Sequence, residues 1–345
     1  MSHMLTEIHE QPQWIERALD SERAGAAALA AAIREQDIRF VIIAARGTSD
    51  HAATYAKYLL EIAAGLPVSL AAPSVYTLYD ARLRLGNTLV MGISQSGQGA
   101  DIVQVLSSAR AVGALTACIT NSADSPITAV SDHVLLCHAG PERSVAATKT
   151  YTTALAVVAL LAGILADRRD LLDGLDAVPS LLRETLSLDE IVARSVERYR
   201  YMEECAVLAR GINQATALEA ALKLTETSYV VAKPYSGADF LHGPIAMVDA
   251  GFPCFLYAPE GRAYPSMLEL ALKIRDRRGE MVVVAQEPEI LGLATTQVPV
   301  PVRVDELLSP LVYIVPGQLI AYHLARTRGE NPDAPRGLSK VTITR

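Results

Sequence analysis

The chain has 345 residues, of which 50% are hydrophobic and 20% are charged, and its formal net charge is −7. This is a globular composition, so it excludes a largely disordered chain. The acidic balance disfavours a nucleic-acid partner, which needs a basic face, although a local cluster of donors can still bind a small anion.

The sequence favours a cytoplasmic protein without a membrane partner. Residues 1–36 lack the apolar core of a secretory signal, and the apolar run at 154–166 is shorter than the ~20 residues that span a bilayer. The four cysteines are far apart, and neither a Cys-x-x-Cys nor a His-Glu-x-x-His pattern occurs. We therefore expect a reducing compartment, no disulfides and no metal site.

Helices and buried strands alternate along the first half of the chain. Residues 13–35 predict a helix from their Ala, Glu and Arg content and from helically spaced Leu and Ile. Apolar strands are expected at 40–45, 88–94, 115–120 and 133–137, with helices at 49–64, where Ser49 or Asp50 is the N-cap, and at 99–112. This alternation is typical of a parallel sheet with helices on both faces.

The pattern repeats in the second half. The Ala-Arg-Gly that ends a strand at 45–47 recurs 164 positions later at 209–211, and Gly97 matches Gly261 at the same offset. Such a repeat indicates an internal duplication. The sequence therefore predicts an α/β fold of two tandem αβα domains with parallel sheets. Their expected bounds are 36–166 and 200–328, with an N-terminal helical segment at 1–35, a helical linker at 167–199 and a C-terminal loop at 329–345.

A Ser/Gly-rich segment, SQSGQG at 94–99, lies at a predicted strand-to-helix junction, and Thr48 and Ser49 follow the first strand. Ligands of parallel sheets bind beyond the carboxyl ends of the strands, where helix N-termini offer free N–H groups to anions. These segments predict a phosphate cradle, and ordinary helix capping is the alternative. The second copy has Ala-Pro-Glu-Gly at 258–261, which suggests one ligand loop and one vestigial loop.

Three ionisable residues share one face of a helix expected at 214–229. Glu219, Lys223 and Glu226 are spaced i, i+4 and i+3. This spacing fits a carboxylate general base tuned by an ammonium group, and it fits equally a solvated ladder of salt bridges, which is the more common arrangement on helices.

Two further segments each contain one residue that could take part in catalysis. His242 stands between turn residues, where an imidazole can transfer protons near neutral pH or simply cap a helix. Lys340 lies in a tail that also carries Leu338, Val341 and Ile343. A lysine held there can form a Schiff base with a carbonyl substrate, whereas in a frayed terminus it would only be solvated.

Together these motifs resemble the tandem sugar isomerase (SIS) family, which includes the isomerase half of glucosamine-6-phosphate synthase. The resemblance runs nearly end to end, through residues 4–12, 46–49, 94–97, 142–149, 217–229, 242–244 and 335–340. Each motif alone is weak, but their shared order is specific. The family fold it implies is flavodoxin-like.

The resemblance implies a set of residues that bind the phosphosugar. The phosphate would be held, and the pocket lined, by Thr48, Ser49, Ser94, Gln95, Ser96, Gly99, Val145 and Ser339. Gly99 stands where the family usually has Thr, so one hydroxyl is lost while the N–H remains. Gln98 and Gly337 also depart from the usual Glu and Asn.

The resemblance also implies the catalytic roles. His242 would open the sugar ring and reach into the site of a partner subunit, so a homodimer is implied. Glu226 would move a proton between C1 and C2, with Lys223 tuning it. Lys340 would contact the open-chain sugar or form an imine with fructose 6-phosphate. We expect no glutaminase domain like that of the synthase, because residues 1–35 carry no N-terminal Cys nucleophile and are too few to form that domain.

The expected activity is therefore that of an amino-sugar phosphate deaminase and isomerase, converting glucosamine 6-phosphate and water to fructose 6-phosphate and ammonia. No metal or other cofactor is expected, because cations and N–H dipoles can stabilise the enediol-type anion. One alternative is a deglycase or deaminase for another amino-sugar or fructosamine 6-phosphate. The other is a non-catalytic phosphosugar sensor.

Overall fold

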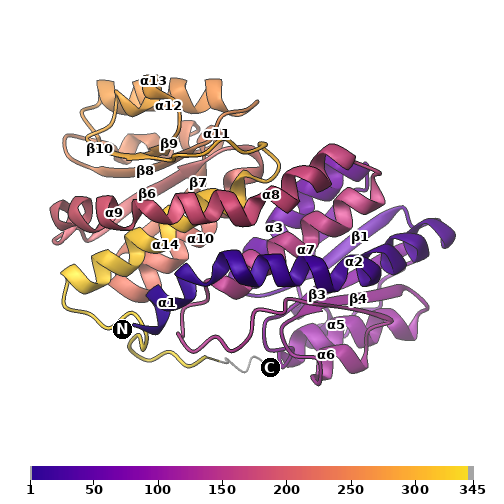
Figure 1. Ribbon diagram of the computed structural model, residues 1–345. Coiled ribbons are helices and arrows are strands. Elements are labelled where there is room, and N and C mark those ends of the chain that lie inside the picture. Colours follow the sequence, from indigo (N-terminus) through magenta and orange to yellow (C-terminus); the bar gives the residue numbers. More distant parts are fainter. Residues whose placement is uncertain (1, 341–345) are drawn as a thin grey trace. The chain divides into compact units, whose positions relative to one another are not determined.

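The structure is a computed structural model that describes residues 2–340 (Figure 1). Its contacts divide the chain into two compact units. Unit 1 contains the segment up to Pro12, Arg143–Thr148 and Ala177–Gly337, and unit 2 contains Gln13–Glu142, Lys149–Asp176 and the segment from Leu338 onward. The units interleave along the chain, and the domain boundaries expected from the sequence stay a prediction.

Unit 2 is built on a five-stranded parallel sheet with the order β2-β1-β3-β4-β5. Its strands are β1 (Phe40–Ala44), β2 (Val68–Leu70), β3 (Thr88–Ile93), β4 (Leu115–Thr120) and β5 (His133–Leu136). β3 and β4 are buried at every position, because a parallel sheet carries helices on both faces. Each of the four strands expected here forms, within one residue of its predicted bounds.

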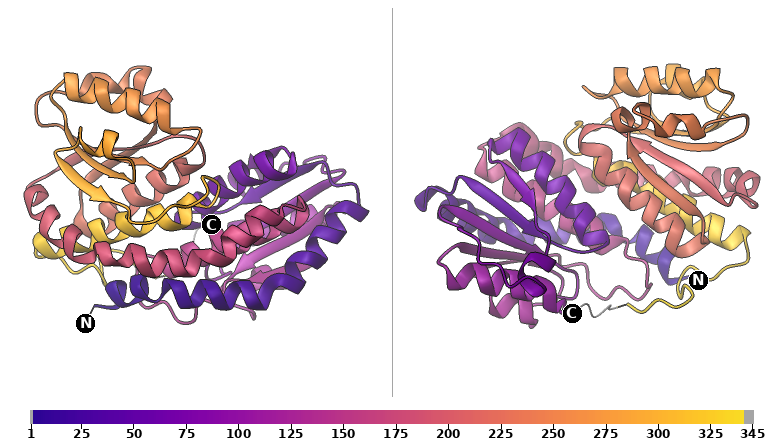
Figure 2. Two further views of the ribbon diagram at one scale, coloured as in Figure 1. Left: turned by 45° about the horizontal axis from the view of Figure 1, so that its top comes forward. Right: turned by 180° about the vertical axis from the view of Figure 1, so that it is seen from behind.

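Helices cover both faces of this sheet (Figures 1 and 2). One face carries the short helix α4 (Ser74–Thr77), α5 (Ala100–Ala111) and the short helix α6 (Pro126–Ala129). The other carries α3 (Thr48–Leu59), which continues as a π-helix over Leu60–Ala64, α7 (Lys149–Leu165) and most of α2 (Gln11–Glu35). α7 is apolar on all sides, which is the pattern of a fully buried helix.

Unit 1 contains a second parallel sheet with the order β10-β9-β8-β6-β7. Its strands are β6 (Glu204–Ala209), β7 (Val231–Ser236), β8 (Pro253–Ala258), β9 (Glu280–Ala285) and β10 (Thr296–Pro299). In chain order, both sheets arrange their strands as 2-1-3-4-5, the flavodoxin-like topology. The predicted pair of parallel α/β domains is confirmed.

Helices also cover both faces of the second sheet (Figure 1). α12 (Tyr264–Asp276) and α13 (Pro288–Leu291) lie on one face, and α10 (Gln214–Ser228) and α14 (Ser309–Thr327) lie on the other. Unit 1 also holds α1 (His3–His9), α9 (Asp189–Ser195) and α11 (Gly237–Leu241), and α8 spans Arg169–Thr185. None of the helices within residues 2–340 is sufficiently long and apolar to cross a membrane.

Two local features differ from the sequence prediction. The edge strands β2, β7 and β10 were not expected, because none is a continuous apolar run. β7 reads VAKPYS and has no buried position, and β10 reads TQVP. The expected N-cap of α3 at Ser49 or Asp50 is wrong. The helix begins at Thr48, and its cap is Gly47, whose φ of 54° lies in the left-handed region that glycine adopts at no steric cost.

Candidate functional site

The predicted phosphate-binding residues gather at one edge of the unit 2 sheet. β1 and β3 are neighbours, and the chain turns in opposite directions from them to reach β2 and β4. Ligands of such sheets bind at this switch point, beyond the carboxyl ends of the strands. Thr48 and Ser49 start α3 there, and Ser94, Gln95 and Ser96 follow β3.

The loop after β3 has a conformation that only glycine permits. Gly97 has a φ of 65°, and a Cβ on it would lie 2.2 Å from the Ser125 hydroxyl. The Gly97 N–H donates to Ser94 Oγ at 3.2 Å, and the Gln98 N–H donates to Ser96 Oγ at 3.3 Å. A hydroxyl that accepts a hydrogen bond keeps its own O–H donor, so both serines are able to donate to an anion.

Gly99 is the N-cap of α5 and makes no side-chain capping bond. In the first turn of α5, the Ile102 N–H donates to Asp101 Oδ1 at 3.0 Å. The first N–H groups of a helix otherwise lack backbone partners within it, and the helix dipole favours an anion beside them. The cradle therefore combines hydroxyl donors with the N-terminal ends of α3 and α5.

The equivalent edge of the unit 1 sheet is arranged differently. The Glu306 carboxylate accepts the N–H groups of Arg262 and Ala263, at 2.8 and 3.0 Å, just before α12. Gly261 has a φ of 143°, and a Cβ there would lie 2.5 Å from the Glu306 carboxyl carbon. In this copy the chain's own carboxylate binds the amides at the start of the helix.

Glu219, Lys223 and Glu226 lie on one face of α10, as their spacing predicts. Lys223 Nζ is 2.6 Å from Glu226 Oε2 and 3.3 Å from Glu219 Oε1. The side chains of Lys223 and Glu219 are fully buried, and that of Glu226 is 24% exposed. The alternative of a solvated ladder is therefore wrong, because two of the three members are out of contact with water.

The electrostatics of this triad keep Lys223 charged. Burial alone would lower the pKa of Lys223, but Glu219 and Glu226 outweigh it, so the pKa is raised above its usual value. An isolated buried charge is very costly, and pairing with hydrogen bonding offsets that cost. The Lys223 ammonium thus holds the Glu226 carboxylate in place, and the Glu226 side chain stays partly exposed.

His242 is exposed at the carboxyl end of α11, where it is the C-cap residue. It precedes Gly243, whose φ of 140° turns the chain into the next short helix. The sequence predicts this histidine among turn residues. The structure adds β7 and α11 directly before it.

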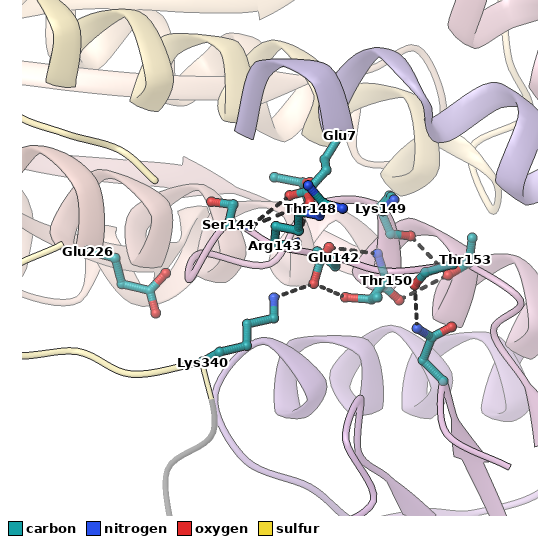
Figure 3. A network of polar contacts seen from close by, with 12 residues as sticks. Glu7, Glu142, Arg143, Ser144, Thr148, Lys149, Thr150, Thr153, Glu226 and Lys340 are labelled. Carbon is teal, nitrogen blue, oxygen red and sulfur yellow. Dashed lines mark hydrogen bonds and ion pairs between the residues drawn. The ribbon is translucent and has the colours of Figure 1, made fainter. Parts of the chain in front are cut away.

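Lys340 is the last residue that the structure describes, and it pairs with a buried carboxylate. Its Nζ lies 2.6 Å from Glu142 Oε2 (Figure 3). The Glu142 side chain is fully buried, while that of Lys340 is 26% exposed. Glu142 also accepts the N–H of Thr150 at 3.1 Å and its hydroxyl at 2.7 Å.

The tail before Lys340 is less buried than its composition suggested. Leu338 is 47% exposed, and Ser339 is exposed as well. Val341 and Ile343 lie outside the described residues. The ion pair with Glu142, and not apolar packing by Leu338, therefore anchors the described end of the tail.

Val145 belongs to a segment that unit 1 ties down at several points. The Glu7 carboxylate, from α1, accepts the backbone N–H groups of Arg143 and of Ser144 (Figure 3). The Val145 N–H donates to the Asp333 carbonyl at 3.2 Å. Neither Glu7 nor Glu142 was predicted to have a role, because their partners are remote in sequence and no local spacing marks them.

The predicted site residues divide between the two units. Unit 2 contains Thr48, Ser49, Ser94, Gln95, Ser96, Gly99, Ser339 and Lys340, and unit 1 contains Val145, Lys223, Glu226 and His242.

The cysteines are placed for packing. Cys118, Cys137, Cys205 and Cys254 are all buried and free. Burial raises the pKa of Cys137 and of Cys254 to about 12 each, so both thiols are neutral near pH 7. Within residues 2–340, no group of three or more His, Cys, Asp or Glu side chains could hold a metal ion.

The duplicated sheets and the loops at their carboxyl edges define a two-domain α/β protein with one cradle suited to an anion. The SIS domain model matches residues 35–163 and again residues 203–328. The chain therefore belongs to the SIS domain family, and the resemblance inferred from its motifs is confirmed.

Curated relatives align with almost the whole chain. Glutamine–fructose-6-phosphate aminotransferase [isomerizing] of Thermus thermophilus is 37% identical over 99% of this chain and 59% of its own length. The protein of the same name from Thermococcus kodakarensis is 38% identical over 99% of this chain and 58% of its own length. The chain thus spans about three fifths of the length of these relatives.

Solved structures agree in fold. A proposed phosphosugar isomerase from Silicibacter pomeroyi has a TM-score of 0.88 and 36% identity, over 96% of this chain and all of that one. The C-terminal domain of glucosamine-fructose-6-phosphate aminotransferase from Francisella tularensis has a TM-score of 0.85 and 27% identity, over 97% of this chain and 98% of that one. Glucosamine-6-phosphate deaminase from Thermotoga maritima, at 20% identity and a TM-score of 0.79, shares the fold.

Proposed function

We propose that the chain is a phosphosugar isomerase that acts as an amino-sugar phosphate deaminase. It converts glucosamine 6-phosphate and water into fructose 6-phosphate and ammonia. The observation that carries this proposal is the Glu226 carboxylate held at 2.6 Å by a fully buried Lys223, since the reaction requires a fixed base at the sugar carbons. The names of the isomerising aminotransferase relatives support the substrate class.

In this proposal the cradle binds the sugar's phosphate group. The proposed donors to this dianion are the hydroxyls of Thr48, Ser49, Ser94 and Ser96, the Gln95 side chain and the Gly99 N–H. Val145 and Ser339 are proposed as further contacts of the substrate. Hydrogen bonds to a charged group are roughly twice as strong as neutral ones. The phosphate thereby fixes the sugar for the steps at C1 and C2, which is the entropic part of catalysis.

The chemistry is a proton transfer followed by hydrolysis. His242 opens the ring and leaves an aldehyde at C1, and in a homodimer it serves the site of the other chain. Glu226 takes the proton from C2 and returns it to C1, while the aldehyde oxygen gains a proton and the amino group at C2 loses one. The product is an imine at C2, and water converts it to the ketone and releases ammonia.

Lys223 and Lys340 assist these steps as cations. Lys223 orients Glu226 and stabilises the enediol-type anion, a role that needs no metal or other cofactor. Lys340 contacts the open-chain sugar, or forms an imine with the ketone of fructose 6-phosphate. The four buried, free thiols fit the cytoplasmic location that we also propose.

The first test is to follow ammonia and fructose 6-phosphate together from glucosamine 6-phosphate, with galactosamine 6-phosphate as comparator. Equal appearance of both products from the gluco sugar supports the proposal. If ammonia is released only from galactosamine 6-phosphate, or only from a fructosamine 6-phosphate, that compound is the substrate. If a phosphosugar raises the melting temperature but is not converted, the chain is a phosphosugar sensor and not an enzyme, since binding alone stabilises the folded state.

The second test is Glu226→Gln, which keeps the size of the side chain and its hydrogen-bonding ability but removes the base. We expect turnover to fall by at least about 100-fold, the contribution of general base catalysis, with phosphosugar affinity nearly unchanged. The exposed carboxylate Glu269 gives a matched control, because Glu269→Gln should leave both quantities unaltered. Retention of most activity by Glu226→Gln would overturn the assignment of the base.

A further inference from the structure

Arg46 lies at the switch point of the unit 2 sheet, between β1 and Gly47. Its Nε donates to Asp101 Oδ2 at 2.8 Å, which joins the loop after β1 to the first turn of α5. The Asp101 side chain is only 3% exposed, whereas that of Arg46 is 54% exposed. The pair therefore combines a buried carboxylate with a guanidinium that is open to solvent.

Two carboxylates lie at the helix ends that form the proposed phosphate cradle, where their negative charge disfavours a bound phosphate. Asp50 lies in the first turn of α3 and Asp101 lies in the first turn of α5. Acidic residues favour helix N-termini through the dipole, but they repel a phosphate bound at the same ends. Asp101 is close to the cradle, since its Oδ1 is 3.4 Å from where a Cβ on Gly99 would stand.

The Arg46 charge acts on both carboxylates. Besides its hydrogen bond to Asp101, Arg46 opposes the rise that burial produces in the pKa of Asp50, as does His51. The guanidinium is thus near the first turns of both helices, which are the two helix ends that form the cradle.

We propose that Arg46 is the cation of the phosphate site. It neutralises Asp101 and Asp50, and its remaining guanidinium N–H groups donate to the phosphate of the substrate. This inference rests on the proposed function, because it assumes that the cradle holds a phosphosugar. A planar guanidinium offers five N–H donors, so one bond to Asp101 leaves donors for a phosphate oxygen.

The second copy of the fold provides an internal contrast. Arg210 occupies the same place after β6, but its Nη1 donates to the Ser236 hydroxyl at 3.3 Å. The amides before α12 are bound by Glu306 in that copy. The arginine is therefore present in both copies, and only in unit 2 is it paired with an acid from the first turn of the neighbouring helix.

The test is a double-mutant cycle of Arg46→Gln, Asp101→Asn and the two combined. The dissociation constants of fructose 6-phosphate and of inorganic phosphate are measured by calorimetry. Arg46→Gln should weaken both ligands by about tenfold to a hundredfold, the size of a hydrogen bond to a charged group. Asp101→Asn should leave binding equal or tighter, because the cation remains and a repelling charge is gone. The double variant should fall between them.

A merely structural ion pair gives a different order. Removal of either partner would then weaken binding equally, and the double variant would recover. That pattern, or binding by Arg46→Gln within about twofold of the unaltered chain, overturns the inference. Arg210→Gln is the matched control and should bind both ligands as before.

Two safeguards keep the outcome clear. If Arg46→Gln fails to fold, Arg46→Lys retains the charge and should bind more tightly than Arg46→Met, whereas a structural role predicts no difference between them. If the unaltered chain binds neither ligand, the proposed phosphosugar function fails together with this inference. If the unaltered chain binds and Arg46→Gln matches it, only the role of Arg46 fails.

Discussion

Lys223 and Glu226 form a 2.6 Å ion pair in which the lysine is fully buried and the carboxylate is partly exposed. Glu219 lies on the other side of Lys223 and is buried as completely as the lysine itself. The Lys223 ammonium is therefore buried on one face of α10, and one of its two carboxylate partners, Glu226, reaches the surface of unit 1. Such an arrangement is expected where a carboxylate must be held for chemistry rather than for stability.

Lys223→Ala should destabilise unit 1, because it leaves the Glu219 carboxylate buried without its cation. Loss of one partner of a buried ion pair costs about 3–5 kcal/mol of the free energy of unfolding. The exposed pair Lys273–Glu269 on α12 is the control, and Lys273→Ala should cost much less, because water screens an exposed ion pair. Urea unfolding of both variants measures the difference. Equal losses in the two would contradict the burial argument.

The free energy of unfolding should be lower at alkaline pH than at neutral pH. The buried thiols of Cys137 and Cys254 have pKa values raised from 9.0 to about 12. A group with a raised pKa in the folded state binds more protons there than in the unfolded chain. Its stabilising contribution is complete below pH 9 and is lost as pH rises from 9 toward 12.

The expected slope is at most about 1.4 kcal/mol per pH unit for each such thiol. Urea unfolding at several pH values between 8 and 11 measures it, and Cys137→Ala should reduce it. A free energy of unfolding that stays constant across this range would show that these thiols do not control alkaline stability.

The sequence predicted the central strands well because of how parallel sheets are buried. β3 and β4 are buried at every position and consist mostly of apolar residues, so their bounds could be read from composition. β7 is half exposed and contains Lys233 and Pro234, so no periodicity marks it. The same topology brings Thr48 and Ser94 to one edge of the sheet, since each follows one of two neighbouring parallel strands.

The environment of the ionisable residues could not be predicted in this way. The spacing of Glu219, Lys223 and Glu226 shows that they share one face of a helix, but it does not show whether that face is buried. The packing of α10 against its neighbours excludes water from it. Glu142 and Lys340 are 198 residues apart, so their ion pair has no local signature. Contacts of this kind depend on tertiary structure, which overrides helix statistics.

Glu142→Gln should lower catalysis by loosening Lys340. The change keeps a hydrogen-bond acceptor for Thr150 but removes the charge that holds the ammonium at 2.6 Å. We expect kcat to fall about tenfold, as for loss of a hydrogen bond to a charged group, with a smaller change in KM. Lys340→Met should lower kcat at least as much, and adding Glu142→Gln to it should have no further effect. Independent, multiplying losses would show that Glu142 acts by another route.

Gly97→Ala should damage the phosphate cradle at its most constrained point. The Cβ would lie 2.2 Å from the Ser125 hydroxyl at a φ of 65°, so the loop must shift and take the Ser94 and Ser96 hydroxyls with it. A strained backbone of this kind costs about 1–3 kcal/mol. Gly86→Ala is the control, since a Cβ there meets nothing within 4 Å.

Calorimetry with fructose 6-phosphate and urea unfolding separate the two effects of Gly97→Ala. We expect weaker phosphosugar binding and a lower free energy of unfolding, with Gly86→Ala unchanged in binding. Removing the clash by Gly97→Ala combined with Ser125→Gly should recover part of the stability but not all, because the positive φ remains unfavourable for alanine. If Gly97→Ala instead binds fructose 6-phosphate as tightly as the unaltered chain, the loop after β3 is not the group that holds the phosphate.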